Sequence, residues 1–257
     1  MQTYQLNDIF ITSVDLIQMS IFLKEKILKN CNPCQIITFN LDNYRISKTE
    51  PDYLRTCKQA ALVLPDGMGF ILLIKLKYGT KLERITGNDL LKILLEICNV
   101  NSFSVAFVGS TPNILTKLKN KIQLNYPNLK VSNILSPSFN FEYNYKENDK
   151  VLSELKESKP DVLFLALGCP RQELWIAKYK DIIGAKINIG VGSAFDFYTR
   201  EKLRAPIIVQ KIYLEWFWRL MTEPRRLFKR YIIQDVPFFF KEATNILFKN
   251  EKISRSA

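Results

Sequence analysis

The sequence predicts an α/β fold built on a parallel sheet, followed by a helical segment of a different character. Short apolar, β-rich runs alternate with amphipathic helical patterns from about residue 5 to residue 197, the order that a parallel sheet flanked by helices requires. One of these runs, DVLFLALG at 161–168, is almost continuously apolar, as expected of a strand buried on both faces. From Thr199 onward, bulky aromatic residues are interleaved with arginine and lysine.

The composition is that of a folded chain with one domain or one and a half. Of the 257 residues, 47% are hydrophobic, which is enough to bury a full core, and 24% are charged. No apolar stretch approaches the roughly 18 to 20 residues of a membrane span. No basic segment precedes an apolar one at the N-terminus, so no signal peptide is predicted. We therefore expect a cytoplasmic protein.

In the N-terminal part, the hydrophobic pattern predicts three strands and four helices. Ser13 or Asp15 can cap the first helix, and Thr86 or Asn88 can cap the last one. The polar stretch at 40–47 is predicted to be a loop. The elements in order are a short strand near residue 5, a helix at 13–30, a strand at 34–40, a helix at 52–60, a strand at 61–67, and helices at 68–79 and 85–100.

Beyond residue 100, four strands alternate with three helices. Pro112 suits the first turn of one helix, and another helix ends before Pro160. The elements are strands at 104–109, 128–135 and 161–168, a last strand with its loop at 185–197, and helices at 110–127, 146–159 and 169–183.

The change in composition near residue 200 predicts a domain boundary, with an α/β domain at 1–198 and a helical appendage at 199–257. Prolines at 206, 224 and 237 predict that the appendage consists of two or three helices. It contains 13 Lys or Arg against 6 Asp or Glu, in a chain of net charge +12. Such a basic end favours an anionic partner such as phosphate, nucleic acid or the inner membrane leaflet, or it is simply a solvated face.

The absence of histidine excludes several kinds of chemistry. Neither a Ser-His-Asp nor a Cys-His site is possible, so a carboxylate, Tyr, Lys or Cys must carry any acid–base step. Cys31 and Cys34 form a CxxC pair with no second pair to complete a zinc site, so ordinary thiols are expected. No Asp-x-Asp triplet occurs. A transferase would therefore need arginine rather than a metal held by that motif to offset leaving-group charge.

Polar and glycine-bearing loops follow five of the predicted strands. In an open parallel sheet, ligands bind at the carboxyl ends of the strands, so these loops are predicted to converge on one crevice. They are Thr38–Asn40, Asp66–Gly67, Gly109–Thr111, Gly168–Gln172 and Gly192–Asp196.

Each loop has a functional and a structural interpretation. Asp66 is a strand-end carboxylate that can act as a base, or it only makes an Asp-Gly turn. The junction at 109–112 can hold a phosphate or only cap a helix. Arg171 and Gln172 can donate to a ligand or only begin a surface helix. GVGSAF at 190–195 is a weak dinucleotide signal, because it lacks the third glycine and an acidic partner.

A basic group on the C-terminal segment is a second candidate binding feature. Arginine side chains match the oxygens of a diphosphate, and the alternative is a solvated basic face. The group consists of Arg219, Arg225, Arg226, Lys229 and Arg230.

Taken together, nine segments resemble one protein family. They are TFNLDN, ALVLPDGMG, RITGNDLL, FVGSTP, PDVLFLALGCPRQELWI, GVGSAFDF, RAP, LEWFWRL and EPRRLFKRY. In this order and spacing, over about residues 5–240, the chain resembles the WecG/TagA/CpsF glycosyltransferases, glycosyltransferase family 26.

The resemblance implies a Rossmann-like, mostly parallel sheet flanked by helices, with a basic aromatic helical C-terminal appendage. It implies an inverting hexosyltransferase, without cofactor and metal-independent, that moves an N-acetylmannosamine-type sugar from a UDP-sugar to N-acetylglucosamine on a polyprenyl diphosphate. The products of such enzymes feed teichoic acid, capsule or common antigen synthesis. The resemblance also implies a peripheral protein on the inner face of the cell membrane that forms homo-oligomers.

The resemblance also assigns roles to single residues. Asp66 matches the proposed general base, and Thr38 and Asn40 match polar positions of the active site. Arg84 and Gln172 match positions near the donor sugar and phosphates. The remaining donor-binding positions are Asp196 in the nucleotide pocket, the loop glycines Gly109, Gly168 and Gly192, and the appendage arginines Arg219, Arg225 and Arg226, which would close over the site and bind diphosphate.

Departures from the family pattern leave alternatives open. Tyr198 and Arg200 stand where a small residue and glycine are more usual, and Cys169 stands where alanine or serine is common. Another UDP-hexose donor, or a non-catalytic scaffold in polysaccharide assembly, therefore stays possible. A dinucleotide enzyme and a nucleic-acid-binding protein are further alternatives. No nucleic acid partner is expected, because the C-terminal aromatics follow helical spacing with leucine and isoleucine.

Overall fold

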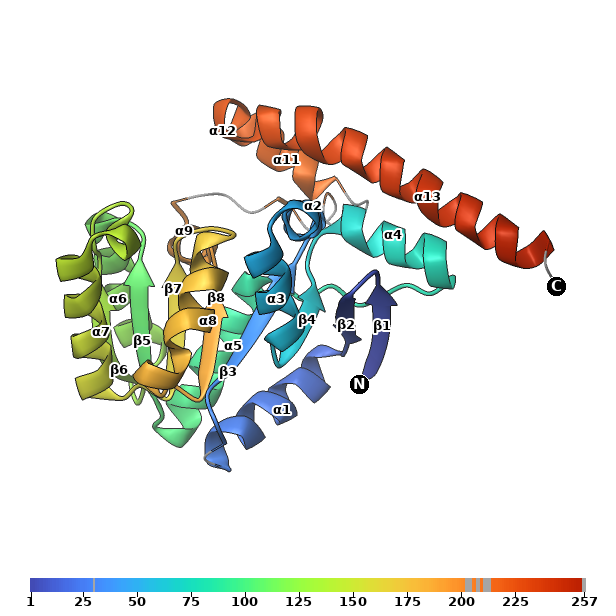
Figure 1. The fold of residues 1–257 in the computed structure, drawn as a ribbon. Helices are drawn as coiled ribbons and strands as arrows, with labels where there is room; N and C mark the ends of the chain where they lie inside the picture. Colours follow the sequence, from blue (N-terminus) through green and yellow to red (C-terminus); the bar gives the residue numbers. More distant parts are fainter. Residues whose placement is uncertain (30, 202–204, 207–208, 210–213, 256–257) are drawn as a thin grey trace.

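The computed structural model describes residues 1–29, 31–201, 205–206, 209 and 214–255. Its centre is a six-stranded sheet in the order β4-β3-β8-β7-β5-β6, and every pair of neighbouring strands is parallel (Figure 1). The predicted α/β fold with a parallel sheet is therefore confirmed. The strands are β3 (Cys34–Phe39), β4 (Leu62–Pro65), β5 (Ser104–Gly109), β6 (Lys130–Leu135), β7 (Val162–Ala166) and β8 (Ile187–Gly190).

The N-terminus forms a hairpin where the sequence predicted one short strand. β1 (Gln2–Leu6) and β2 (Ile9–Ser13) pair antiparallel, with Leu6 opposite Ile9. Asn7 adopts a left-handed conformation at φ 51° in the two-residue connection. Asn is among the residues that tolerate this conformation in tight hairpin turns, so the Asn-Asp pair was the missed signal.

In the described residues before 200, nine α-helices surround the two sheets. Asp15 caps the first by accepting a hydrogen bond from the Gln18 N–H at 2.7 Å, and Thr86 caps α5 in a capping box with Asp89. The helices are α1 (Leu16–Leu28), α2 (Leu41–Thr49), α3 (Pro51–Gln59), α4 (Met68–Tyr78), α5 (Gly87–Asn101), α6 (Pro112–Asn125), α7 (Tyr145–Ser158), α8 (Arg171–Ile183) and α9 (Ala194–Thr199). A short 3₁₀ turn, η1 (Phe141–Tyr143), precedes α7.

Helix α2 occupies the stretch that was predicted to be a loop, so that prediction was wrong. Asn40 begins the helix, because its side-chain oxygen accepts from the backbone N–H groups of Asp42 and Asn43. The helix is polar in sequence, yet Asp42, Asn43 and Tyr44 are buried. Their side chains meet hydrogen-bonding partners from distant segments, which a local hydrophobic pattern cannot reveal. The short helix α9 also lies where only a loop was predicted.

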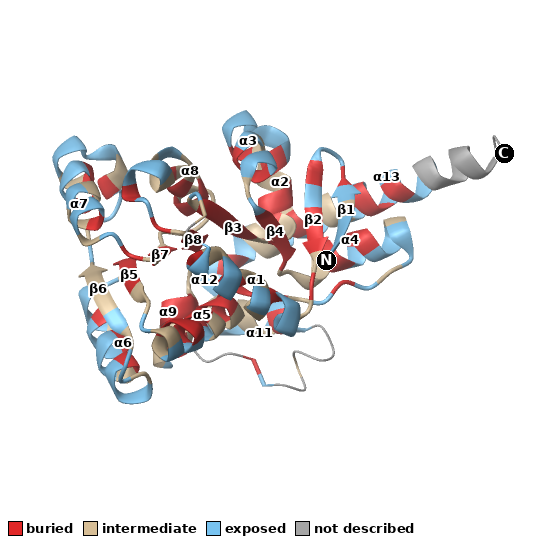
Figure 2. Ribbon diagram, turned by 90° about the horizontal axis from the view of Figure 1, so that it is seen from below, coloured by how far each residue is buried: buried red, intermediate tan, exposed pale blue. Residues whose placement is uncertain are grey.

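The core lies on both faces of the sheet, as alternation along each strand requires. On one face, strand residues such as Ile36, Phe107 and Phe164 pack against α1, α5 and α6. On the other face, one group of side chains packs under α2, α3 and α4, and another packs under α7 and α8. Figure 2 shows the central strands of the sheet buried and the edge strand β6 only partly buried.

The C-terminal segment crosses above the carboxyl ends of the strands (Figure 1). It contains α11 (Glu215–Thr222), α12 (Pro224–Phe228), the π-helical turn η2 (Lys229–Asp235) and α13 (Val236–Arg255). In the described part of the chain, no helix has both the length and the apolar character that a membrane span needs.

Of the three predicted helix breaks, one is confirmed and one is wrong. Pro224 begins α12, as predicted. Pro237 does not interrupt the helical backbone, because η2 continues directly into α13 and Pro237 is the second residue of α13, in the first turn where proline is tolerated. The wider turn η2 comes immediately before it, and such turns locally relax the hydrogen-bond ladder that proline disrupts. Pro206 lies in a stretch that is mostly outside the described residues, so its predicted break has no counterpart here.

Helix α13 is held to the α/β body by a buried carboxylate. Glu242 accepts hydrogen bonds from the Tyr44 hydroxyl at 2.8 Å and from the Lys48 ammonium at 3.0 Å. Around this contact, Ala243 and Ile246 pack into the core beside α4. One polar contact and one apolar stripe therefore fix α13 against the body.

We expect Glu242→Ala to destabilise the protein by about 2 kcal/mol, because it leaves a buried hydroxyl and an ammonium without their acceptor. Chemical denaturation measures this loss, and hydrogen exchange should show faster exchange in α13. The exposed neighbour Lys241, changed to Ala, is the matched control. Equal stability of the two variants would contradict this role of Glu242.

Candidate active site

The five predicted loops meet around one polar cavity of about 330 Å³. Thr38 at the end of β3 and Asp66 after β4 line it from one side, and Ser110 after β5 lines it from the other. The turns after β7 and β8 contribute Gly168 and Gly192. This convergence follows from the parallel sheet, whose strands all end at the same edge.

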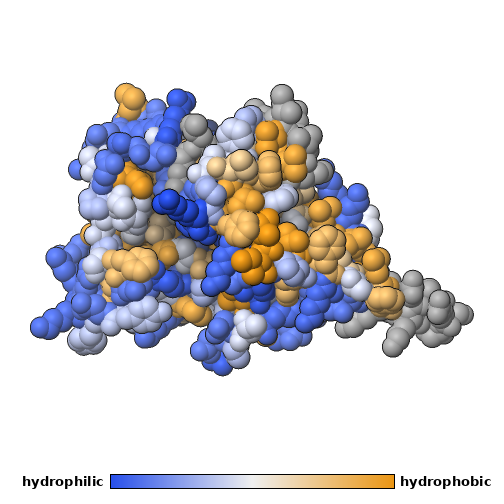
Figure 3. Space-filling model, turned by 90° about the horizontal axis from the view of Figure 1, so that it is seen from above, coloured by the Kyte–Doolittle hydropathy of each residue, from blue (hydrophilic) through white to orange (hydrophobic). Residues whose placement is uncertain are grey.

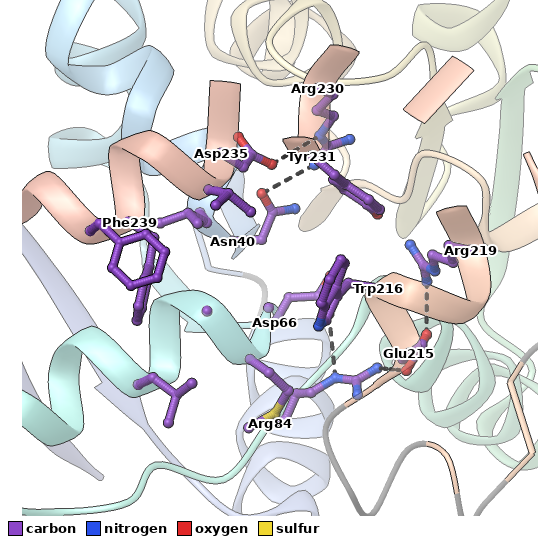
Figure 4. Close-up of a pocket in the computed structure, with 17 residues that line it drawn as sticks. Asn40, Asp66, Arg84, Glu215, Trp216, Arg219, Arg230, Tyr231, Asp235 and Phe239 are labelled. Atoms are coloured by element: carbon purple, nitrogen blue, oxygen red, sulfur yellow. Dashed lines mark hydrogen bonds and ion pairs between the residues drawn. The ribbon is translucent and has the colours of Figure 1, made fainter. Parts of the chain in front are cut away.

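A second cavity of about 420 Å³ lies between α4 and the C-terminal helices. Its apolar lining side chains are Leu41, Met68, Leu72, Trp216, Val236, Phe239 and Phe240. Five residues line both cavities, namely Asn40, Asp66, Arg219, Arg230 and Tyr231. The two cavities are therefore neighbours that share a polar wall, part of which Figure 4 shows.

Asp66 is fixed in this wall by the backbone around it. Its N–H donates to the Phe39 carbonyl at 2.9 Å, so it continues the pairing of β3 with β4. At Gly67, a Cβ atom would lie 2.7 Å from the Asn40 Cβ, closer than real side chains approach. The glycine therefore lets the strand end, the cap of α2 and the start of α4 come together, and it sets the position of the carboxylate.

The environment of Asp66 combines burial with a nearby positive charge. Burial raises the pKa of this carboxyl group above its ordinary range, while Arg84 and Arg219 oppose the shift, and Glu215 and Asp89 add to it. The Arg84 Nε lies 3.7 Å from Asp66 Oδ1, and 25% of the Asp66 side chain is exposed. Asp66 is thus a partly desolvated carboxylate, more basic than one in water and open to the cavities.

Glu215 joins the two arginines that face Asp66. It accepts hydrogen bonds from the Arg84 and Arg219 guanidinium groups at 2.5 and 3.0 Å. The Arg219 guanidinium also lies over the Phe197 ring, 4.9 Å from its centroid. Because Glu215 is buried on α11, it orients both arginines and ties the C-terminal segment to the site (Figure 4). The sequence prediction missed Glu215, although it is an isolated acid in the aromatic stretch 214–222.

A second ion-pair cluster fixes the turn η2 on α2. The Arg230 Nε lies 3.0 Å from Asp42 and 3.7 Å from Asp235, and the Arg45 Nε lies 3.5 Å from Asp235. Burial, with the neighbouring Asp42 charge, raises the pKa of Asp235 to about 6. Arg230 also donates to the Asn40 side-chain oxygen at 3.4 Å. Local sequence patterns did not indicate this cluster, because its members come from α2 and η2.

Gln172 links two of the loops rather than presenting a free amide. Its side-chain oxygen accepts from the N–H groups of Gly168 at 3.1 Å and Gly192 at 3.0 Å. Its nitrogen donates to Glu173 at 2.8 Å. A Cβ at Gly190 would lie 2.6 Å from the Gln172 amide, so only glycine leaves room for it. Gln172 lines the polar cavity, as predicted, and it also sets the shape of that cavity.

Glu173 is a buried acid beneath the polar cavity that the sequence prediction missed. Only 2% of it is exposed, and burial raises its pKa to about 7, with smaller effects from Gln172, Cys169 and Asp42. One of its carboxylate oxygens is buried without a hydrogen-bond partner. The floor of the cavity therefore holds a carboxyl group that keeps its proton until near neutral pH.

Most of the predicted site residues line at least one of the two cavities. They are Thr38, Asn40, Asp66, Arg84, Gly168, Gln172, Gly192, Asp196, Arg219 and Arg226. Two predicted residues, Gly109 and Arg225, line neither cavity. Ser110, next to Gly109, lines the polar cavity, and Arg225 is exposed on α12. Arg226 is paired with Glu223 at 2.7 Å. Asn88, not predicted as a ligand, lines the polar cavity with its side-chain oxygen buried and unpaired.

The site places the partly buried carboxylate of Asp66 beside several cations that suit phosphate. Arg219, Arg226 and Arg230 reach the polar cavity from the C-terminal helices, and guanidinium groups pair well with phosphate oxygens. Among the described residues, no group of three or more Cys, Asp or Glu side chains is arranged to hold a metal ion.

Comparisons with known proteins agree with this chemistry. The sequence model described as "Glycosyl transferase WecG/TagA/CpsF family" matches residues 6–252. A Bacillus subtilis (strain 168) protein is 27% identical over 226 residues, 88% of this chain and 86% of its own length. A Staphylococcus aureus (strain NCTC 8325 / PS 47) protein is 27% identical over 213 residues, 82% of this chain and 80% of its own. Both are named N-acetylglucosaminyldiphosphoundecaprenol N-acetyl-beta-D-mannosaminyltransferase.

The buried Glu173 predicts a specific dependence of stability on pH. Because its pKa is higher in the folded chain, the folded state holds its proton longer, and the free energy of unfolding falls as pH rises from about 4.5 to about 7. Glu173→Gln keeps the acceptor for Gln172 and removes the titration. The variant should therefore gain stability relative to wild type by up to about 3 kcal/mol across this range.

Denaturation curves of both proteins at about pH 5 and about pH 8 measure this difference. Glu157→Gln, at an exposed position of α7, is the control and should follow wild type. A Glu173→Gln curve that is parallel to wild type at both pH values would show that Glu173 ionises normally.

Proposed function

The chain belongs to the WecG/TagA/CpsF family of glycosyl transferases, and from this premise we propose its reaction. It transfers an N-acetylmannosamine-type sugar from a UDP-sugar to N-acetylglucosamine carried on a polyprenyl diphosphate. The names of the relatives supply the sugar and the acceptor. The observation that carries the proposal is the position of Asp66 in the wall shared by a polar and a largely apolar cavity.

The polar cavity is the proposed site of the nucleotide sugar. Loops at the strand ends offer hydrogen bonds to sugar hydroxyls, and the buried oxygen of Asn88 needs a donor there. The diphosphate of the donor would lie near Arg219, Arg226 and Arg230. The acceptor would approach Asp66 from the second cavity, so that its hydroxyl and the anomeric carbon of the donor meet at the shared wall.

In the proposed step, the acceptor hydroxyl oxygen attacks the anomeric carbon while the Asp66 carboxylate takes its proton. A new C–O bond forms, the bond between the anomeric carbon and the UDP oxygen breaks, and UDP leaves from the opposite face with its added negative charge. The configuration at the carbon is therefore inverted. Partial burial makes the Asp66 carboxylate more basic, and the Arg84 and Arg219 charges favour its ionised form.

Arginine would offset the charge that develops on the leaving UDP. A fixed cation aimed at developing charge in a water-poor site contributes roughly 3 kcal/mol to transition-state stabilisation. Two of the candidates, Arg219 and Arg230, are held in place by the carboxylates of Glu215 and Asp42. Such preorganisation supports a reaction that proceeds without a metal ion.

The face of the C-terminal helices supports peripheral contact with the inner membrane leaflet. Figure 3 shows apolar side chains gathered on this face beside hydrophilic ones. Exposed apolar residues of the segment include Leu214, Trp216, Phe217, Met221, Phe228, Ile232, Ile233, Phe240, Leu247 and Phe248. Aromatics that alternate with basic residues bind the interface of an anionic membrane. A lipid-linked acceptor would reach the site from such a surface.

We expect Asp66→Asn to lower the rate of transfer by at least about 100-fold, because the amide cannot take the proton of the acceptor. Binding of UDP should stay near wild type, since the change is isosteric and does not alter the predicted phosphate ligands. UDP release and UDP calorimetry measure the two effects. The exposed Asp52, changed to Asn, is the control. Near-normal turnover of Asp66→Asn would remove Asp66 from the role of base.

The full-length chain should float with anionic liposomes at low salt, and less of it should float at high salt. Phe217→Ser with Met221→Ser should weaken flotation by at least about tenfold, because both side chains are exposed on α11 and line neither cavity. Leu124→Ser, at an exposed position of α6, is the control. If wild type does not float, the membrane contact is wrong.

A further inference from the structure

The second cavity has walls of two kinds. One part of it is lined by charged side chains, namely Asp66, Arg84, Glu215, Arg219, Arg230 and Asp235. Along α4 and α13 it is lined by Met68, Leu72, Val236, Phe239 and Phe240. Figure 4 shows Phe239 on one side of the cavity and the charged cluster around Arg84 and Glu215 on the other. A ligand that matches both ends must be polar at one end and apolar at the other.

The apolar end is open to the surface. Leu72 is 40% exposed and Phe240 is 64% exposed, although both line the cavity. Farther along the same two helices, Ile74 of α4 and Ile246 of α13 are buried in the same hydrophobic cluster. Val236, which also lines the cavity, is 37% exposed. The cavity is therefore open to the surface along the side formed by Leu72, Val236 and Phe240, which we call its mouth.

The mouth opens on the face that carries the exposed apolar residues of the C-terminal helices. Phe240 belongs both to the cavity wall and to that exposed face. An extended apolar chain could thus pass from the cavity to this face while it stays in contact with apolar side chains. Burial of such a chain is favourable in proportion to the apolar area removed from water.

We propose that the apolar end of this cavity, at Leu72, Phe239 and Phe240, binds the isoprene units next to the diphosphate of the acceptor lipid. This assignment rests on the proposed function, because it takes the acceptor to be a prenyl diphosphate. The sugar of the acceptor occupies the end near Asp66, and the rest of the chain leaves through the mouth. The enzyme therefore selects its acceptor by the lipid as well as by the sugar.

Helix α4 offers a matched pair of variants for a test. Leu72 and Leu76 lie one turn apart and are 40% and 39% exposed, but only Leu72 lines the cavity. Leu72→Trp should fill the apolar end without touching Asp66 or the arginines. Leu76→Trp adds the same bulk outside it and controls for effects on the helix and on membrane contact.

Binding is measured first, by calorimetry with farnesyl diphosphate in the absence of membranes. Wild type and Leu76→Trp should bind it, and Leu72→Trp should bind at least about tenfold more weakly, while UDP binds equally to all three. The same measurement is made with dodecyl diphosphate, which carries a linear alkyl chain. Equal binding of the dodecyl and farnesyl compounds would assign the cavity to any alkyl chain and overturn the choice of a prenyl ligand. Equal binding of farnesyl diphosphate to both variants would overturn the site.

Turnover separates this inference from the proposed function. Wild type should use a farnesyl-diphosphate acceptor at least about tenfold more efficiently than the same sugar diphosphate with a methyl group, and Leu72→Trp should lose that preference. Transfer by wild type with no preference for the prenyl chain would overturn the inference and leave the reaction standing. Farnesyl diphosphate that binds at Leu72 without any sugar transfer would instead contradict the proposed reaction.

Discussion

Three buried carboxylates hold the C-terminal helices over the strand ends, and both cavities depend on that attachment. Glu215, Asp235 and Glu242 are each less than 10% exposed, and each pairs with cations of the α/β body, at Arg84, Arg45 and Lys48 respectively. A buried carboxylate is unfavourable unless it is paired, so the segment satisfies these charges only when it lies in this position. Apolar packing of α13 on α4 and these ion pairs together hold the segment in place.

The same attachment gives the site its chemical character. The C-terminal helices cover the end of β4, which desolvates Asp66 and raises its pKa. They also bring Arg219, Arg226 and Arg230 to the polar cavity, where a diphosphate would need them. The raised pKa of Asp66 and the cations proposed to bind phosphate therefore both depend on one docked segment. The π-helical turn η2 contributes directly, because Arg230, Tyr231 and Asp235 all lie on it.

Much of this arrangement follows from the sequence, and the exceptions have identifiable causes. Apolar runs and caps predicted the parallel strands and most helices, and the sheet geometry then predicted that the loops at Thr38, Asp66 and Gly168 would meet. Helix α2 was missed because its polar residues are buried through tertiary contacts. Glu215 and the cluster around Arg230 were missed because their partners are far away in sequence. Local patterns report which residues are polar, whereas pairing across the fold decides which of them are buried.

The most direct test is UDP release by the purified protein with UDP-N-acetylmannosamine and a short-chain prenyl-diphosphate N-acetylglucosamine acceptor, with and without EDTA. Base catalysis by Asp66 with charge neutralisation by arginine predicts release that depends on the acceptor and persists in EDTA. Acceptor-dependent release that EDTA abolishes would contradict the arginine-based account of the leaving group. Protein that neither binds UDP nor releases it from any of a panel of UDP-sugars would contradict the reaction itself.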